Sequence, residues 1–197
     1  GRLDDIVLHR YRQTLEPGSP DIVLLSPRDS AKPYFADFGW VDSNNTVYGT
    51  DDTPWRTSSA RLTPNDPLVL TWNNGKGVRL TRTYAIDQDY MITVTQRAEN
   101  TSGATVSLYP FGRLTRIGKP DTAGFYILHE GPIGVFDDSL KEVDYDDLKD
   151  DGPKSFDTTG GWLGYTDKYW LAALVPGLQE TVRANFSHGL TTRGEDR

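Results

Sequence analysis

The sequence contains no cysteine. This absence excludes disulfides, thiolate chemistry and zinc sites built on cysteine. It does not indicate a compartment, because a chain without cysteine suits the periplasm and the cytosol equally. No stretch is apolar for long enough to span a bilayer, and none has the layout of a signal peptide. Any membrane anchor is therefore expected outside these residues.

Positive charge is also in short supply. The 21 Lys and Arg residues are outnumbered by 28 Asp and Glu, which gives a formal net charge of −7. Such a surface repels phosphate backbones, so no nucleic-acid partner is expected. It also repels anionic lipid headgroups, and charge therefore does not draw this surface to a membrane. The acidity instead favours solubility.

Large apolar side chains are plentiful. The 197 residues include five Trp, ten Tyr and seven Phe, which is enough to build a substantial core. All-β sandwiches often reach this length as one unit. We therefore predict a single domain over residues 1–197.

Apolar and polar residues alternate on both sides of a turn in the middle of the chain. Residues 68–72 read Leu-Val-Leu-Thr-Trp, and residues 78–84 read Val-Arg-Leu-Thr-Arg-Thr-Tyr. Between them, residues 73–77 read Asn-Asn-Gly-Lys-Gly. A period of two on either side of an Asn/Gly turn predicts a β-hairpin.

The same pattern extends through most of the chain. No long segment shows a capped apolar stripe of helical period, so a substantial helix is not expected. Many strands joined by short turns predict an all-β, antiparallel sandwich. Two segments, 46–67 and 144–159, look like exposed loops. The other predicted strands are 5–11, 22–25, 34–40, 90–97, 105–114, 125–129, 134–136, 162–165, 169–174 and 181–187.

The acidic segment at 144–159 is the first candidate for a metal site. An EF-hand loop with Gly152 at its invariant glycine would place Lys149 at one ligand position. It would also place Thr158 where a carboxylate is required. The match fails, so we interpret this segment as a solvated, charged loop.

Histidine offers little for catalysis. His9, His129 and His188 are far apart and lack the spacing of a metal site. His129 is followed by Glu130, but neighbours on a strand point to opposite faces and do not converge on one substrate. Phosphate-binding loops, dinucleotide fingerprints and nucleophile elbows are missing as well. We therefore expect no catalytic residue, no metal site and no cofactor.

Aromatic residues are candidates for either a core or a binding groove. A sandwich of this size needs several large inward-facing groups, so most should be buried. Trp162 and Trp170 are expected in the core, on either side of a turn at 164–168. Trp55 lies in a polar, proline-containing segment and is the candidate partner contact. The full set is Trp40, Trp55, Trp72, Trp162, Tyr169 and Trp170.

Several strings, taken together, resemble one known family. The sharpest is Gly160-Gly161-Trp162-Leu163, followed by Tyr169-Trp170 and then by Val175-Pro176. It resembles the Gly-Gly-Trp … Tyr-Phe/Trp … Ile/Val-Pro segment of the periplasmic domain of bacterial YidC-type membrane protein insertases. These strings are most similar to those of alphaproteobacterial members. Weaker strings in the same order lie at 1–11, 22–26, 34–39, 126–131 and 133–134.

The resemblance implies a β-supersandwich of the galactose mutarotase type, on the periplasmic face of the inner membrane of a Gram-negative bacterium. It implies a position between the first transmembrane helix and a five-helix insertase core. The implied partners are nascent inner-membrane proteins and components of the Sec translocon. The functional arginine of the family lies in the membrane core, so no active-site residue is carried onto this chain. The family continues beyond the point that corresponds to Arg197, and we expect its remaining strands and a helix to be missing here.

Three functions remain open at this point. The first is a non-enzymatic accessory domain that assists insertion and folding of membrane proteins. The second is a carbohydrate-binding or aldose-epimerase-like protein, because the supersandwich is shared with sugar-binding proteins. The third is a structural spacer around the insertase. Fold alone does not decide among them.

Overall fold

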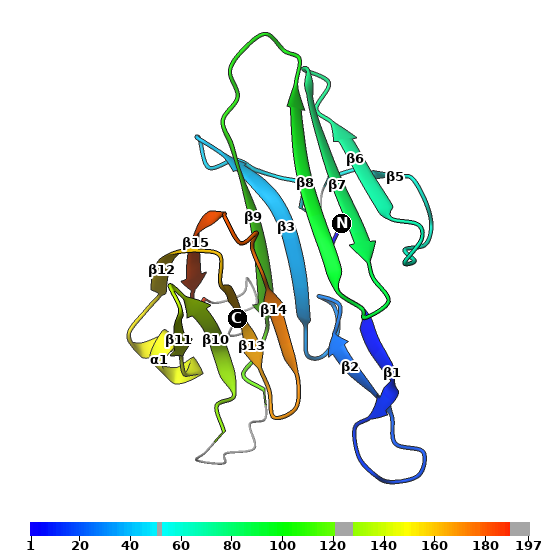
Figure 1. Ribbon diagram of the computed structural model, residues 1–197, viewed down its shortest axis with the longest axis vertical. Coiled ribbons are helices and arrows are strands. Elements are labelled where there is room, and N and C mark those ends of the chain that lie inside the picture. Colours follow the sequence, from blue (N-terminus) through cyan, green and yellow to red (C-terminus); the bar gives the residue numbers. More distant parts are fainter. Residues whose placement is uncertain (51–52, 121–127, 190–197) are drawn as a thin grey trace. The chain divides into compact units, whose positions relative to one another are not determined.

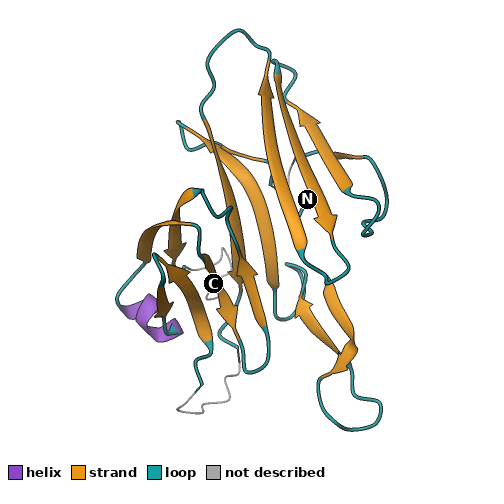
Figure 2. Cartoon of the chain, viewed as in Figure 1, coloured by secondary structure: helices purple, strands orange, loops and turns teal. Residues whose placement is uncertain are grey.

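The computed structural model describes residues 1–50, 53–120 and 128–189, which contain fifteen strands and one short helix (Figures 1 and 2). All strand pairs with a defined register are antiparallel. The predicted all-β, antiparallel class is therefore confirmed. The residues gather into two compact units. Unit 1 comprises Gly1–Arg2 and Asp37–Gly112, and unit 2 comprises Leu3–Ala36 and Arg113–Arg197.

Unit 1 contains a four-stranded sheet in the order β5-β6-β7-β8. The predicted hairpin forms its centre, with Leu68 opposite Tyr84 and Asn73 opposite Arg79. Its turn depends on Gly75 and Gly77, whose positive φ angles favour glycine. The strands are β4 (Val47–Tyr48), β5 (Arg56–Thr57), β6 (Leu68–Asn73), β7 (Val78–Ile86) and β8 (Ile92–Asn100), together with parts of β3 (Tyr34–Asp42) and β9 (Leu108–Arg116).

A buried arginine lies in the core of unit 1. Arg82 has no exposed surface, because strand period two places it on the inward face with Leu80 and Tyr84. Its guanidinium donates to the carbonyls of Gly1 (2.7 Å), Gly49 (2.9 Å) and Phe38. The ring centroids of Phe38, Trp40 and Trp55 lie 6.0, 5.6 and 4.9 Å from the guanidinium carbon. Carbonyl dipoles and aromatic faces thus replace the hydration of this cation.

Unit 2 contains three smaller sheets, in the orders β1-β2, β12-β15 and β11-β10-β13-β14. Its core is aromatic, with the Phe136 and Phe156 rings stacked 4.5 Å apart and Phe186 edge-on to both. The elements are β1 (Ile6–Arg12), β2 (Asp21–Leu25), β10 (Gly131–Phe136), β11 (Ser139–Glu142), α1 (Tyr145–Asp150), β12 (Lys154–Thr159), β13 (Trp162–Thr166), β14 (Leu171–Leu174) and β15 (Thr181–Phe186).

Unit 2 also encloses an arginine. Arg116 makes two hydrogen bonds to the Asp167 carboxylate, at 2.7 and 2.6 Å, and a third to the Tyr145 hydroxyl at 3.0 Å. Its guanidinium carbon lies 4.1 Å from the centroid of Tyr34 and 5.9 Å from that of Tyr165. Burial is the largest influence and lowers the pKa of Arg116, but the bond to Asp167 and the electrostatic attraction of Tyr145, Asp167 and Tyr34 together keep the pKa above its ordinary value.

The Gly160-Gly161 pair of the recognised motif forms the tight turn between β12 and β13. Both residues have positive φ, at 70° and 77°. A Cβ on Gly161 would collide with the carbonyl oxygen of Val135 on β10, so backbone and side-chain space both require glycine there. The Gly160 N–H donates to the Glu180 carbonyl at 3.0 Å, which closes the turn against the start of β15.

One predicted loop was wrong. Residues 144–159 form α1 and then β12, because Leu148 is buried in the core of unit 2 and Phe156 stacks on Phe136. In the other predicted loop, 46–67, the described residues hold only two-residue strands, β4 and β5.

Two core assignments and one strand also need correction. Trp162 and Trp170 are half-buried rather than fully buried. Trp162 is on the outward side of β13, whose inward positions belong to Leu163 and Tyr165. Trp170 is the last residue of a turn at 167–170, where the Asp167 N–H donates to its carbonyl, and its ring lies edge-on to Tyr11. Of the predicted strand 125–129, residues 125–127 lie outside the described residues, and 128–129 are not in a strand.

Candidate binding surface

The outward face of the sheet β11-β10-β13-β14 is unusually apolar. Leu163 and Tyr165 of β13 point toward the core of unit 2, so Trp162, Gly164 and Thr166 point away from it. An antiparallel sheet with one solvated face normally presents polar residues there. Here the outward positions also include Glu142 and Thr166, but they are mainly aliphatic or aromatic, and the exposed Val175 follows directly after β14. The apolar outward residues of the strands are Leu140, Ile133, Val135, Trp162, Leu171 and Ala173.

Cross-strand register arranges these residues in rows. Leu140, Val135 and Trp162 are directly paired across three strands. The next row runs from Ile133 through Gly164 to Ala173. Side chains in such rows lie close enough to form one continuous surface. We call the outward residues Ile133, Val135, Leu140, Trp162, Leu171, Ala173 and Val175 the apolar face.

This face is open to solvent at its margins. Leu140 is 56% exposed, Leu171 48% and Val175 61%. Nearby on the chain, Tyr169 is 75% exposed and Leu178 is 79% exposed. Apolar side chains that gather at one surface, rather than scattering singly, indicate a contact site for another molecule.

Strand β14 forms one border of this face and is an edge strand. Among the described strands it pairs only with β13. Its sequence, Leu-Ala-Ala-Leu, carries neither a charge nor a proline, and Pro176 follows only after the strand has ended. Edges are usually protected by such residues, as β11 is by Lys141 and Glu142. An unprotected edge next to an apolar face suits the addition of an extended segment as a further strand.

Unit 1 holds a groove of a different kind, with a volume of about 290 Å³. Tyr48 and Trp72 contribute aromatic rings, whose centroids lie 6.2 Å apart. Asp42 fixes the hairpin turn beside it by accepting bonds from the Asn44 and Thr46 N–H groups and from the Tyr48 hydroxyl. The bond from Thr46 is the main cause that lowers the pKa of the Asp42 carboxyl. The groove is thus polar at its rim, with no Lys, Arg or His among its lining residues.

The residues predicted from sequence are scattered. Trp55 is half-buried, with Arg82 over its ring, so a partner contact through Trp55 stays a prediction and only part of the ring is available for it. Trp162 belongs to the apolar face, and Tyr169 is exposed at the turn before β14. The face as a whole escaped sequence analysis, although the run from Leu171 to Leu174 was a signal.

The histidines are not brought together. His9 Nδ1 lies 2.6 Å from the Asp21 carboxylate, and His129 Nε2 lies 3.0 Å from the Pro132 carbonyl. The acidic segment provides an ion pair between Asp146 and Lys119. Within the described ranges, no three His, Asp or Glu side chains are placed to hold a metal ion.

Comparison with known proteins identifies the family. Residues 1–195 match the family described as the YidC periplasmic domain. The chain belongs to this family. It is 44% identical over 197 residues to the membrane protein insertase YidC of Methylobacterium nodulans, covering 95% of this chain and 33% of that protein. The YidC proteins of Bradyrhizobium diazoefficiens and Granulibacter bethesdensis are 44% and 42% identical, with 95% and 94% of this chain and 31% and 33% of their own lengths covered.

Membership in the YidC family fixes where the domain resides. A YidC periplasmic domain lies on the periplasmic side of the inner membrane. The chain spans about one third of the length of the YidC proteins it matches. In the part of the chain that the structure describes, no helix is both long and apolar enough to cross a bilayer.

Proposed function

We propose that this chain is a non-catalytic accessory domain of a membrane protein insertase, and that it binds extended, apolar segments at β14 and the apolar face. In this role it assists the insertion and folding of inner-membrane proteins. The observation that carries the proposal is the unprotected edge strand beside an apolar sheet face whose margins are exposed to solvent. The relatives are named membrane protein insertases, which supports a client of this kind.

The physical match is between an edge and an extended chain. Backbone groups along an edge give affinity that does not depend on sequence, and the side chains of the face select for apolar residues at alternate positions. A membrane protein segment in transit is apolar and unfolded, so it offers both features. The same surface suits an edge or loop of a Sec component, which is the second partner class that we propose.

A matched pair of variants tests this proposal. The double variant Leu171→Lys/Ala173→Lys places two charges on the edge strand β14. The control, Thr93→Lys/Thr95→Lys, does the same on β8, the edge of the sheet in unit 1. We expect the first variant to weaken binding of a labelled, extended apolar peptide by about tenfold, equivalent to about 1.4 kcal/mol. The control should bind normally. Equal affinity of both variants and the parent chain would contradict the proposal.

The accessory role is tested in the full-length protein. A soluble domain of net charge −7 offers no bilayer-spanning path, so the essential step on an apolar helix belongs to the membrane-spanning part. We expect an insertase that lacks the segment matching residues 1–150 to support growth of a depletion strain while its contacts with Sec partners weaken. Failure of growth, although the truncated protein accumulates in the membrane, would show a direct role for this domain.

The absence of catalysis has its own test. His9 lies against the exposed Asp21 carboxylate, and His129 lies against the Pro132 carbonyl, so these contacts do not place both side chains on one substrate proton. A variant with His9, His129 and His188 all replaced by Gln should insert a model substrate at the normal rate. A loss of insertion in a variant that is still folded would contradict the proposal and favour a catalytic role for at least one histidine.

The groove in unit 1 favours a second candidate function, the binding of a neutral carbohydrate. Aromatic rings beside amide and hydroxyl groups are the usual lining of such sites, and Tyr48, Trp72 and Asn74 supply them. Titration with simple hexoses, followed by intrinsic tryptophan fluorescence, distinguishes the two functions. A saturable change that is lost in Trp72→Phe would support sugar binding, and no change would leave the peptide-binding proposal as the function of the domain.

A further inference from the structure

The hairpin of β1 and β2 in unit 2 ends in a loop that presents a leucine to solvent. Leu15 is fully exposed, at 105% of its reference surface, and Tyr11 on the same hairpin is 55% exposed. Residues 9–18 are all exposed, so this loop projects from unit 2. An isolated exposed leucine is ordinary. Leu15 differs because hydrogen bonds within its loop hold the side chain toward solvent.

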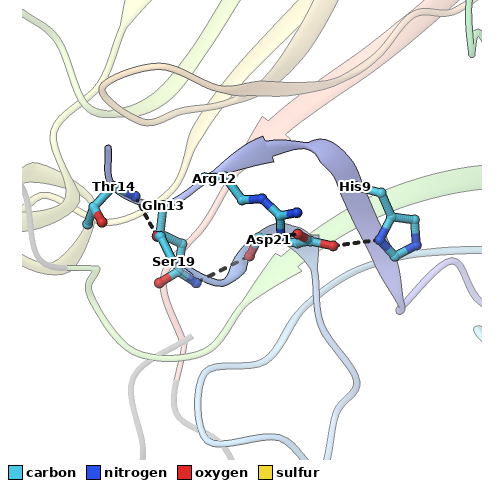
Figure 3. Close-up of polar contacts among 6 residues, drawn as sticks. All are labelled: His9, Arg12, Gln13, Thr14, Ser19 and Asp21. Carbon is cyan, nitrogen blue, oxygen red and sulfur yellow. Dashed lines mark hydrogen bonds and ion pairs between the residues drawn. The ribbon is translucent and has the colours of Figure 1, made fainter. Parts of the chain in front are cut away.

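Hydrogen bonds fix the loop in place (Figure 3). The Gln13 N–H donates to the Pro20 carbonyl at 3.0 Å. The Thr14 N–H donates to the Ser19 hydroxyl at 2.9 Å. The Ser19 N–H in turn donates to the Glu16 carbonyl at 3.1 Å, and Ser19 itself is buried. Because these bonds hold the backbone on both sides of Leu15, its outward position is set before any partner arrives, and little ordering entropy remains to be lost on docking.

Opposite charges are paired where the two strands enter the loop. The Asp21 carboxylate lies between His9 and Arg12 and contacts both (Figure 3). Within 9–21 the two arginines, Arg10 and Arg12, offset Glu16 and Asp21, whereas the whole chain carries −7. An anionic surface therefore repels most of this chain but not the hairpin.

We propose that the tip of the β1–β2 hairpin docks on the phospholipid surface of the membrane beside which this domain lies. Leu15 enters the boundary between headgroups and acyl chains, Tyr11 lies at headgroup level, and Arg10 faces the phosphates. Aromatic residues with a polar end favour this interface, and basic side chains next to it are attracted to anionic lipid. The location of the family on the periplasmic side of the inner membrane places such a surface within reach.

The proposal can be tested by fluorescent labelling. Because the chain has no native cysteine, a single introduced Cys is the only site that a thiol-reactive fluorophore labels. We label Glu16→Cys at the tip, and Lys76→Cys in the β6–β7 turn of unit 1 as control, with an environment-sensitive fluorophore. Vesicles of phosphatidylethanolamine with phosphatidylglycerol should shift the emission of the tip label to the blue and leave the control label unchanged. A shift of neither label, or the same shift of both, overturns the proposal.

Single variants then separate the contribution of Leu15 to vesicle binding from that of Arg10. Leu15→Ser should lower partitioning to these vesicles by about three- to tenfold, because the variant no longer buries a leucine side chain partly in the bilayer. The matched control Leu178→Ser, at another highly exposed leucine of unit 2, should partition normally. Arg10→Gln should weaken binding only when phosphatidylglycerol is present. Unchanged partitioning of Leu15→Ser overturns the proposal. A tip label that responds to a purified protein partner but not to vesicles assigns the tip to a protein pocket, which overturns it as well.

Discussion

The two units treat their outward sheet faces in opposite ways. In unit 1 the outward positions of β6, β7 and β8 are rich in threonine and end in an ion pair between Arg97 and Glu99, 2.8 Å long. The outward threonines are Thr71, Thr81, Thr83, Thr93 and Thr95. In unit 2 the equivalent positions form the apolar face. Both sheets are antiparallel and both have a buried inner face, so the fold does not require this difference. This difference supports the proposal that extended apolar segments bind at the sheet of unit 2.

The interiors differ too, in how each stabilises an arginine. Arg82 of unit 1 is fully buried against carbonyls and aromatic faces. Arg116 of unit 2 instead has a bidentate partner, the Asp167 carboxylate, and 31% of the Asp167 side chain is exposed. When a fully buried cation such as Arg82 is removed, the buried Phe38 and Gly49 carbonyls lose its hydrogen bonds and cannot replace them with bonds to water. A partly exposed carboxylate can be rehydrated. The two arginines should therefore respond differently to mutation.

The largest effect is expected for Arg82→Ala. The variant takes the guanidinium donor from the Phe38 and Gly49 carbonyls, while the Gly1 carbonyl keeps its bond from the Tyr84 hydroxyl. It also leaves a cavity among aromatic rings, and the two losses should cost about 3–5 kcal/mol of unfolding free energy. Arg82→Lys should recover only part of this, because an ammonium cannot match the planar fork or stack on the rings. Urea unfolding measures both. Arg79→Ala on the outward face of the same strand is the control and should change stability by less than about 0.5 kcal/mol.

A smaller loss is expected for Arg116→Ala, about 2–3 kcal/mol, because solvent can reach the Asp167 carboxylate that remains. Removing the other partner, in Asp167→Asn, keeps the shape of the site but leaves Arg116 without its counter-charge. If Arg116→Ala were more destabilising than Arg82→Ala, the contrast drawn between carbonyl and carboxylate partners would be wrong.

Alkaline pH should destabilise unit 2 through its tyrosines. Burial raises the pKa of Tyr165 to about 12, and it also raises the pKa values of Tyr34 and Tyr145. In the unfolded chain they ionise near pH 10, so above that pH the native state holds more protons than the unfolded state. Stability is therefore complete below about pH 10 and falls between about pH 10 and 12, by about 1–3 kcal/mol for Tyr165 alone.

The tyrosine prediction is checked by urea unfolding at a series of pH values. Tyr165→Phe cannot ionise, so its stability should fall less steeply across the same interval. Burial also raises the pKa of Tyr84 in unit 1, and Tyr84→Phe serves as the comparison. Parallel pH profiles for the parent chain and Tyr165→Phe would show that ionisation of Tyr165 does not limit the alkaline stability.

Sequence patterns predicted the fold better than the surface. The hairpin of β6 and β7 followed from strict alternation and an Asn/Gly turn. The burial of Arg82 beside Leu80 was not predicted, because a charge on the inward side argues against burial. Helix α1 has a single buried residue, Leu148, and is too short for a stripe to show. The strand β12 was hidden because acidic residues precede it, even though Phe156 and Thr158 alternate with exposed neighbours.

The binding surface could not be read from the sequence, because it depends on register between distant strands. Leu140, Val135 and Trp162 form a row only once β10 is paired on both sides. The expectation that a tryptophan belongs in the core placed Trp162 on the wrong face. The pairing of Arg116 with Asp167, fifty-one positions apart, likewise has no local signature. The proposals that a single domain spans residues 1–197 and that Trp55 contacts a partner stay predictions.

The smallest change in stability, and the sharpest test of the comparison, comes from exchanging the outer surfaces. In unit 2, Leu140→Thr/Leu171→Thr gives two outward positions the polarity found in unit 1. Because both side chains are about half exposed, the unfolding free energy should change by less than about 1 kcal/mol. Binding of the extended apolar peptide should nevertheless fall clearly, as measured by fluorescence anisotropy.

The reverse exchange, Thr83→Val/Thr95→Val, gives unit 1 two adjacent apolar positions across β7 and β8. It should not create peptide binding, because β8 still carries Arg97 and Glu99 on its outward side, and charge on an edge discourages strand addition. The proposed binding in unit 2 is expected to require both features, an apolar face and an unprotected edge. If the valine variant bound the peptide as tightly as the native surface of unit 2, apolar area alone would suffice and the special role of β14 would be lost. If Leu140→Thr/Leu171→Thr bound normally, the edge alone would suffice, because backbone pairing would then supply the affinity without help from the side chains.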